Sequence, residues 1–178
     1  MGLDLTLSTY ALIGGSVVTS NVLFSNISTT AVGVVPLLNG RFGPIDIRVK
    51  DKVDIWTQFF KKASVTALAS VALTAACSTV VYLNHPSAFV RKLSVTGAIC
   101  SALVVPYTVL FLAPTNSELF DIHKSGDLDT GVAGDENPRA KHANALLDKW
   151  EKLHNVRYLA FISGWALALT ALVMDNRA

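Results

Sequence analysis

Four long stretches of this chain contain no Asp, Glu, Lys or Arg, and they constrain its fold more than any other feature. They cover residues 5–40, 63–84, 93–117 and 158–174. A helix needs about 20 apolar residues, and at least about 17, to cross a hydrocarbon core of about 30 Å. Each stretch reaches that length, and the alternation of a β-barrel is missing. The sequence therefore predicts an all-α bundle of four transmembrane helices.

Composition supports a membrane protein and excludes a nucleic-acid-binding one. Hydrophobic residues make up 51% of the chain and charged residues 16%, whereas a soluble domain carries about 25% charged residues. The net charge is +2, too small for the basic surface that nucleic acid requires. We expect one integral membrane domain over residues 1–178, with spans at about 8–27, 63–84, 93–113 and 157–174.

The connection between the third and fourth spans is expected to be a long polar loop. It is acidic and rich in glycine, and we expect it to be mobile over about residues 121–139. Strong helix formers follow Pro138. They predict a helix that runs without a break into the fourth span. In the third span, Pro106 is expected to produce a kink.

The distribution of Lys and Arg predicts the orientation in the membrane. The first and third loops each hold six of these residues, and three others lie elsewhere. The first six are Arg41, Arg48, Lys50, Lys52, Lys61 and Lys62, and the second six are Lys124, Arg139, Lys141, Lys149, Lys152 and Arg157. The positive-inside rule then places both long loops in the cytosol and both termini on the lumenal or outer side.

Polar residues from several helices are expected to meet where the chain enters the membrane. Trp150, His154 and Arg157 are spaced i, i+4 and i+7, so they share one helix face. The antiparallel third span leaves the membrane on the same side, which brings Asn116 to the same depth. Such a convergence at the interface is a candidate binding site.

Each of these residues also has an ordinary structural interpretation. Trp56 and Gln58 begin the second span on the same side, but Trp56 and Trp150 also suit the aromatic belt of a membrane protein. Arg157 can reach lipid phosphates from a helix end. A metal site at His123, His142 and His154 has no recognised ligand spacing, so we expect no metal.

Two motifs resemble those of the anthrone oxygenase family. Pro114-Thr115-Asn116-Ser117-Glu118-Leu119 is similar to the family's P-T-N-x-x-L motif at the end of the third span. The segment from Trp150 to Arg157 is similar to its W-x-x-L-(N/H)-x-V-R motif, and Trp56 matches a further family tryptophan. The resemblance implies a four-helix membrane protein of fungal secondary metabolism, in the biosynthesis of aromatic polyketides.

The resemblance also implies an activity and a set of roles. Family members oxidise an anthrone to an anthraquinone with dioxygen, as cofactor-independent monooxygenases. By this reading His154 is the general base, while Arg157 and Asn116 stabilise the enolate oxygen. Trp150 stacks on the substrate, and Trp56 and Gln58 complete its binding site.

Two further expectations concern the membrane in which the protein resides and a function without catalysis. We expect the endoplasmic reticulum membrane as the location, with dioxygen as a co-substrate and no organic cofactor. The alternative is a non-catalytic four-helix scaffold or pathway-associated protein. An ion-coupled transporter is disfavoured, because the spans contain no charged residue.

Overall fold

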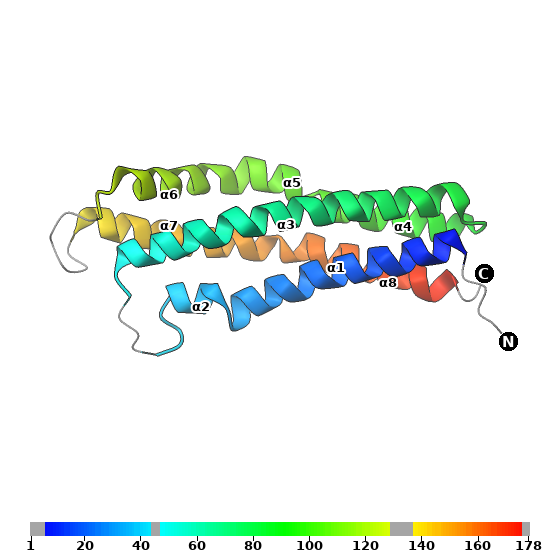
Figure 1. The fold of residues 1–178 in the computed structure, drawn as a ribbon, viewed down its shortest axis with the longest axis horizontal. Helices are drawn as coiled ribbons and strands as arrows, with labels where there is room; N and C mark the ends of the chain where they lie inside the picture. Colours follow the sequence, from blue (N-terminus) through cyan, green and yellow to red (C-terminus); the bar gives the residue numbers. More distant parts are fainter. Residues whose placement is uncertain (1–5, 44–46, 129–136, 176–178) are drawn as a thin grey trace. The chain divides into compact units, whose positions relative to one another are not determined.

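The computed structural model describes residues 6–43, 47–128 and 137–175, and within them the chain forms helices without strands (Figure 1). Four helical segments of this described part are long and apolar enough to cross a membrane. They are Leu7–Leu38, Val49–Asn84, Ala88–Ser125 and Pro138–Asp175. The predicted all-helical chain with four apolar helices, as in an integral multi-pass membrane protein, is confirmed.

The first two segments contain the long helices α1 and α3, and nearby side chains explain where each of these helices begins. Helix α1 (Leu7–Ala31) begins after Thr6, whose Oγ1 accepts a hydrogen bond from the Thr9 backbone N–H at 3.2 Å, as in a helix N-cap. A short helix, α2 (Val34–Leu38), follows Gly33. Helix α3 (Val49–Asn84) begins well before the predicted span at residue 63, because Val53, Trp56 and Thr57 bury one face of its first turns.

The third segment is interrupted before and after Pro106. Helix α4 (Ala88–Ala102) ends at Leu103, and α5 (Val104–Tyr107) follows. The π-helical turn η1 (Thr108–Leu112) then leads into α6 (Ala113–Ser125). Pro106 and Pro114 lack a backbone N–H, and the ring of each crowds the preceding turn. Near Pro106 the α-helix is broken at Leu103 and gives way to a π-helical turn at Thr108–Leu112.

The fourth segment consists of α7 (Pro138–Val156) and α8 (Tyr158–Asp175). The sequence predicted an unbroken helix, but Arg157 between them adopts a turn. Its carbonyl accepts from the N–H groups of both Ala160 and Phe161 at 3.1 Å, which tightens the chain locally. The predicted loop over 121–139 is partly helical, because α6 continues to Ser125 and α7 begins at Pro138; residues 129–136 lie outside the described residues.

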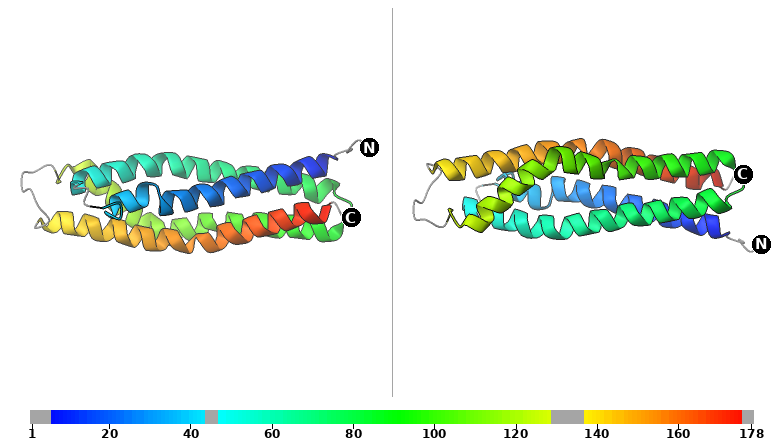
Figure 2. Two further views of the ribbon diagram at one scale, coloured as in Figure 1. Left: turned by 90° about the horizontal axis from the view of Figure 1, so that it is seen from below. Right: turned by 90° about the horizontal axis from the view of Figure 1, so that it is seen from above.

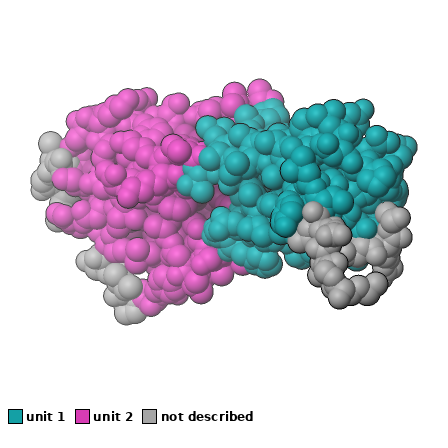
Figure 3. Space-filling model, turned by 45° about the vertical axis from the view of Figure 1, so that its right-hand side comes forward, with its two compact units in different colours: residues 1–25, 66–106, 157–178 teal, residues 26–65, 107–156 magenta. Residues whose placement is uncertain are grey.

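The contacts divide the chain into two compact units (Figure 3). Unit 1 comprises Met1–Ser25, Thr66–Pro106 and Arg157–Ala178, and unit 2 comprises Asn26–Val65 and Tyr107–Val156. Each unit has its own apolar core. Leu12, Val81, Val90 and Ala171 pack together in unit 1, and unit 2 holds the larger core that contains Trp56 and Trp150.

In unit 1, α4 and α8 lie side by side over much of their length (Figure 2). Small residues allow this close approach. Gly97 and Gly164 face each other so closely that a methyl group on Gly164 would overlap Ser101 Oγ and come within 3.2 Å of the Gly97 carbonyl oxygen. Helices in membranes commonly pack through such small residues, because lipid provides little hydrophobic force between helices.

We expect Gly164→Ala to destabilise the protein by about 1–3 kcal/mol, the usual cost of overpacking a tight contact. Thermal unfolding in lipid nanodiscs measures this loss. Ser101→Ala should restore part of the stability of Gly164→Ala, because it removes the overlapping oxygen. Gly14→Ala is the control, since its added methyl would meet Cys77 Sγ at an ordinary 3.4 Å. Equal stability of Gly164→Ala and Gly14→Ala would contradict this packing.

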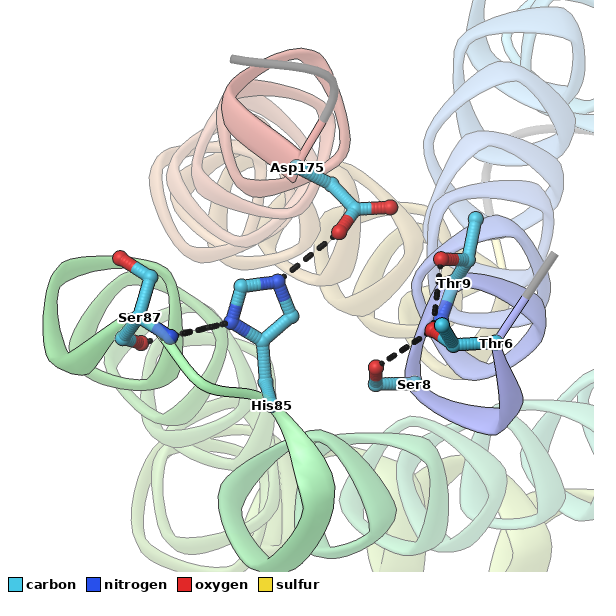
Figure 4. Close-up of polar contacts among 6 residues, drawn as sticks. All are labelled: Thr6, Ser8, Thr9, His85, Ser87 and Asp175. Atoms are coloured by element: carbon cyan, nitrogen blue, oxygen red, sulfur yellow. Dashed lines mark hydrogen bonds and ion pairs between the residues drawn. The ribbon is translucent and has the colours of Figure 1, made fainter. Parts of the chain in front are cut away.

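A buried histidine joins the end of α3 to the end of α8 (Figure 4). The backbone N–H of Ser87 donates to His85 Nδ1 at 3.0 Å, and His85 Nε2 lies 2.8 Å from Asp175 Oδ1. With Nδ1 as the acceptor, the proton on Nε2 points at the carboxylate. Both functional nitrogens of a nearly inaccessible side chain are thereby satisfied.

His85→Ala is expected to destabilise the protein by about 1–3 kcal/mol, because it leaves the Asp175 carboxylate without this partner. The thermal midpoint of unfolding reports the loss. Asn84→Ala is a matched control, since the exposed Asn84 side chain donates to the Val80 carbonyl of its own helix. If both variants unfold at the wild-type temperature, the His85–Asp175 contact does not stabilise the fold.

Candidate functional site

An aromatic cluster forms the centre of unit 2. The Trp56 side chain of α3 is completely buried. Its ring stacks on Phe60 with centroids 5.2 Å apart, and Phe120 of α6 lies at the same centroid distance. The edge of Trp150 from α7 completes the arrangement, with ring centroids 6.1 Å from Trp56. Three helices therefore contribute to one apolar, aromatic environment.

His154 lies directly on this aromatic cluster. Its imidazole stacks on Trp150 with centroids 4.8 Å apart and planes 23° apart. His154 follows Trp150 by four residues, so one turn of α7 brings both rings to the same buried face. Phe59 approaches Trp150 edge-on at 6.4 Å. A histidine that is 4% exposed is thus held against the flat face of Trp150.

The segment that leads into α6, Tyr107 and the π-helical turn η1, contacts α7 beside His154. Tyr107 donates its hydroxyl to the Leu153 carbonyl of α7 at 3.1 Å, next to His154 in sequence. The π-helical turn at Thr108–Leu112 then adds one residue to the helical repeat. Such turns are frequent at functional sites. Past it, Thr115, Asn116 and Leu119 form the buried face of α6, and Leu119 packs in the core of Trp56 and Trp150.

Several buried polar atoms of unit 2 have no hydrogen-bond partner among the described residues. They come from α3, α6 and α7. These atoms are Trp56 Nε1, Thr57 Oγ1, Thr115 Oγ1, Asn116 Oδ1 and Trp150 Nε1. Each such atom costs about 1–3 kcal/mol when it is left unsatisfied. We refer to them as the buried polar set. All five residues belong to unit 2, and buried polar atoms of this kind need a partner such as water or a bound polar molecule.

Hydrogen bonds between histidine and carboxylate side chains, outside the aromatic cluster, join the helices of unit 2. His123 Nδ1 lies 2.7 Å from Asp54 Oδ1, which joins α6 to α3. His142 Nε2 lies 2.7 Å from Glu118 Oε1, which joins α7 to α6. Within the described ranges, no three His, Cys, Asp or Glu side chains lie together as a potential metal site. The sequence expectations about metals and cofactors stay predictions.

The structure brings together some of the predicted site residues. Trp56, Trp150 and His154 are in contact, and Asn116 is buried in the same unit. Gln58 is exposed. Arg157 is buried in unit 1, where its guanidinium carbon lies 5.3 Å from the centre of the Phe161 ring. The roles assigned to all of these residues stay predictions.

Sequence reasoning missed Thr57 and Thr115, whose hydroxyls belong to the buried polar set. For Thr57 a signal existed. Val53, Trp56, Thr57 and Phe60 follow the i, i+3, i+4, i+7 spacing of one helix face, which would have favoured Thr57 over Gln58. For Thr115 the same kind of signal existed, because Thr115, Leu119 and Ile122 follow the i, i+4, i+7 spacing of one face of α6.

These features define a helical multi-pass membrane protein. Its α3, α6 and α7 together form a buried site with aromatic and polar side chains. A family model described as anthrone oxygenase matches residues 56–167. The chain belongs to the anthrone oxygenase family. The matched range contains Trp56, Asn116, Trp150 and His154, which are all buried in unit 2.

A curated relative gives a second comparison. Anthrone oxygenase nsrD from Aspergillus novofumigatus (strain IBT 16806) is 32% identical to this chain over 84 residues. The matched region covers 47% of this chain and 46% of the relative, so the chain spans about half the length of that protein. No solved structure matches this chain.

Proposed function

We propose that this protein is a membrane-bound monooxygenase that oxidises a polyketide anthrone to an anthraquinone with dioxygen. The observation that carries the proposal is the stack of His154 on Trp150 beside the buried polar set. It offers a base, flat aromatic walls and hydrogen-bonding groups in one core. Membership of the family and the name of the curated relative support the choice of substrate class.

The chemistry begins with removal of a proton. An anthrone carries an acidified methylene opposite its carbonyl, and His154 is the proposed base that takes one of these protons. The resulting anthrolate gives one electron to dioxygen, and the carbon radical and superoxide combine to a peroxide. Protonation and loss of water leave the new carbonyl. Anthrone and dioxygen thus give anthraquinone and water, without an organic cofactor.

The buried polar set suggests how the substrate is oriented. The indole N–H groups of Trp56 and Trp150 are donors, and we assign them to the enolate oxygen, together with the amide N–H of Asn116. The unpartnered atom of Asn116 is its acceptor Oδ1, which suits a phenolic O–H of the substrate. Donors already in place before the reaction stabilise developing negative charge most effectively. Arg157 is a further proposed stabiliser of this charge.

The proposed setting is the endoplasmic reticulum membrane of a fungal cell, with lumenal termini and cytosolic long loops. An anthrone is flat and apolar, so it partitions into a bilayer. Trp150 and His154 are 2% and 4% exposed, so substrate reaches them after neighbouring side chains move. The buried site therefore suits a substrate that arrives from the membrane.

We expect Thr115→Val to lower kcat/KM for an anthrone while leaving stability unchanged or slightly raised. Its buried hydroxyl has no partner among the described residues, so its removal relieves a desolvation penalty. Loss of a substrate hydrogen bond should reduce kcat/KM about tenfold, which corresponds to roughly 1.4 kcal/mol of transition-state stabilisation. Steady-state kinetics and thermal unfolding on the same preparation separate the two effects. Unchanged kinetics would remove Thr115 from the substrate site.

The proposed function is tested by oxygen uptake in membranes that contain this chain, with emodin anthrone as the probe. Uptake should exceed that of empty membranes, persist in a chelator, and fall in His154→Gln. His142→Gln is the control, because His142 is exposed and pairs with Glu118. Uptake that a chelator abolishes would contradict the metal-free mechanism. No uptake above empty membranes would contradict the activity and favour the scaffold alternative.

A further inference from the structure

An open groove of about 440 Å³ runs along α1 in unit 1. Ile13, Val17, Asn21 and Phe24 line it and recur at the spacing of one helix face. The apolar members of this stripe are well exposed, with Val17 at 62% and Phe24 at 55%. We call these four residues the α1 stripe. Ser16, Ser20 and Ser25 also line the groove, and Asn21 is the one carboxamide among the lining residues.

Two hydrogen bonds between α1 and α8 show how deep the Asn21 side chain lies along the apolar segment. Ser16 donates to the Ala168 carbonyl at 3.2 Å, and Trp165 Nε1 donates to Ser20 Oγ at 3.0 Å. Ser20, and hence Asn21, is therefore level with Trp165. With a rise of 1.5 Å per residue, Trp165 lies roughly 12 Å from Arg157 and 15 Å from Asp175. These charged residues bound the apolar segment of α8, so Asn21 lies near its middle.

A polar group at that depth needs a partner. Asn21 is exposed, and no described side chain or backbone group forms a hydrogen bond with its amide. The neighbouring hydroxyl of Thr19, by contrast, donates to the Gly15 carbonyl at 2.9 Å. Acyl chains offer neither donors nor acceptors. The amide is therefore costly while it faces lipid.

We propose that the α1 stripe binds the α1 stripe of a second copy of this chain, through a pair of Asn21 side chains. A carboxamide carries both donors and an acceptor, so two identical amides across a twofold axis satisfy each other. A twofold interface uses the same patch on both subunits. One buried Asn in an apolar helix stripe also fixes the register of the pair. This dimer is independent of the activity proposed above.

Cross-linking in the membrane tests the dimer. Val17→Cys should yield a disulfide-linked dimer on mild oxidation in lipid vesicles that contain the purified protein alone. Leu68→Cys is the matched control, because Leu68 is 58% exposed on α3 outside the α1 stripe. Wild-type protein gives the background from Cys77 and Cys100. Asn21→Leu in the Val17→Cys background should lower the dimerisation constant about five- to tenfold, the effect of one or two interhelical hydrogen bonds.

Three results would overturn the proposal. They are a monomer at every lipid-to-protein ratio, equal cross-linking of Val17→Cys and Leu68→Cys, or a dimer that Asn21→Leu does not weaken. Cross-linking of Val17→Cys in cell membranes to a protein of different mass would likewise replace the second copy with another partner. At a lipid-to-protein ratio high enough to keep both proteins monomeric, thermal unfolding of Asn21→Leu should match wild type, since dimerisation then adds nothing to stability. Lost stability would show that Asn21 acts within the monomer.

Discussion

His154→Gln is expected to lower kcat/KM for an anthrone by about 10²–10⁴-fold, the contribution typical of general-base catalysis. Glutamine keeps the polarity and much of the volume of histidine, but it does not accept a proton near neutral pH. The stacked position on Trp150, at 4.8 Å between centroids, should tolerate this replacement. The loss should therefore appear in catalysis and not in folding.

Three measurements on purified protein in nanodiscs distinguish loss of the base from misfolding and from weaker substrate binding. The thermal midpoint of His154→Gln should stay near that of wild type. The rate of His142→Gln should also stay near wild type, because it changes an exposed histidine of the same helix. The rate of the mutant should not recover at higher substrate concentration. Full activity of His154→Gln would show that another group removes the proton.

The largest expected effect on stability comes from Trp56→Ala. Removal of a fully buried tryptophan costs about 3–5 kcal/mol, because the lost contacts leave a cavity. Trp56 packs against Phe60, Phe120 and Trp150, so the cavity would open at the centre of the unit 2 core. Thermal unfolding should move to a markedly lower temperature.

Trp56→Phe separates packing from hydrogen bonding. Phenylalanine keeps the stacking on Phe60 and removes Nε1, which has no partner in the described part of the chain. We expect it to retain most of the stability that Trp56→Ala loses, while kcat/KM falls about tenfold for one lost hydrogen bond to the substrate. If Trp56→Ala were as stable as wild type, Trp56 would not be the centre of this core.

The helices could be predicted from the sequence because charges are excluded from hydrocarbon. The four charge-free stretches correspond to four long helices. The pattern could not show how far these helices continue beyond the membrane. Helix α3 begins at Val49 and α6 ends at Ser125, since polar and charged side chains are compatible with helix outside lipid. The turn at Arg157 carries no signal in composition.

The candidate site was predictable where one helix face determined it. Trp150 and His154 are four residues apart, and the structure places their rings in contact. Thr115 was predictable in the same way, because it shares one face of α6 with Leu119 and Ile122 at i, i+4 and i+7. The pairing of Trp56 with Phe120 depends on contacts between distant segments. Periodicity within one segment contains no information about such contacts.

The central claim is that the protein inserts an oxygen atom from dioxygen into an anthrone, and isotope labelling tests it most directly. Purified protein in nanodiscs should convert emodin anthrone under ¹⁸O₂ to a quinone with one labelled oxygen at the new carbonyl. The second labelled atom should appear in water, with one dioxygen consumed for each quinone formed. A quinone that takes this oxygen from water, or forms no faster than in empty nanodiscs, would contradict the account.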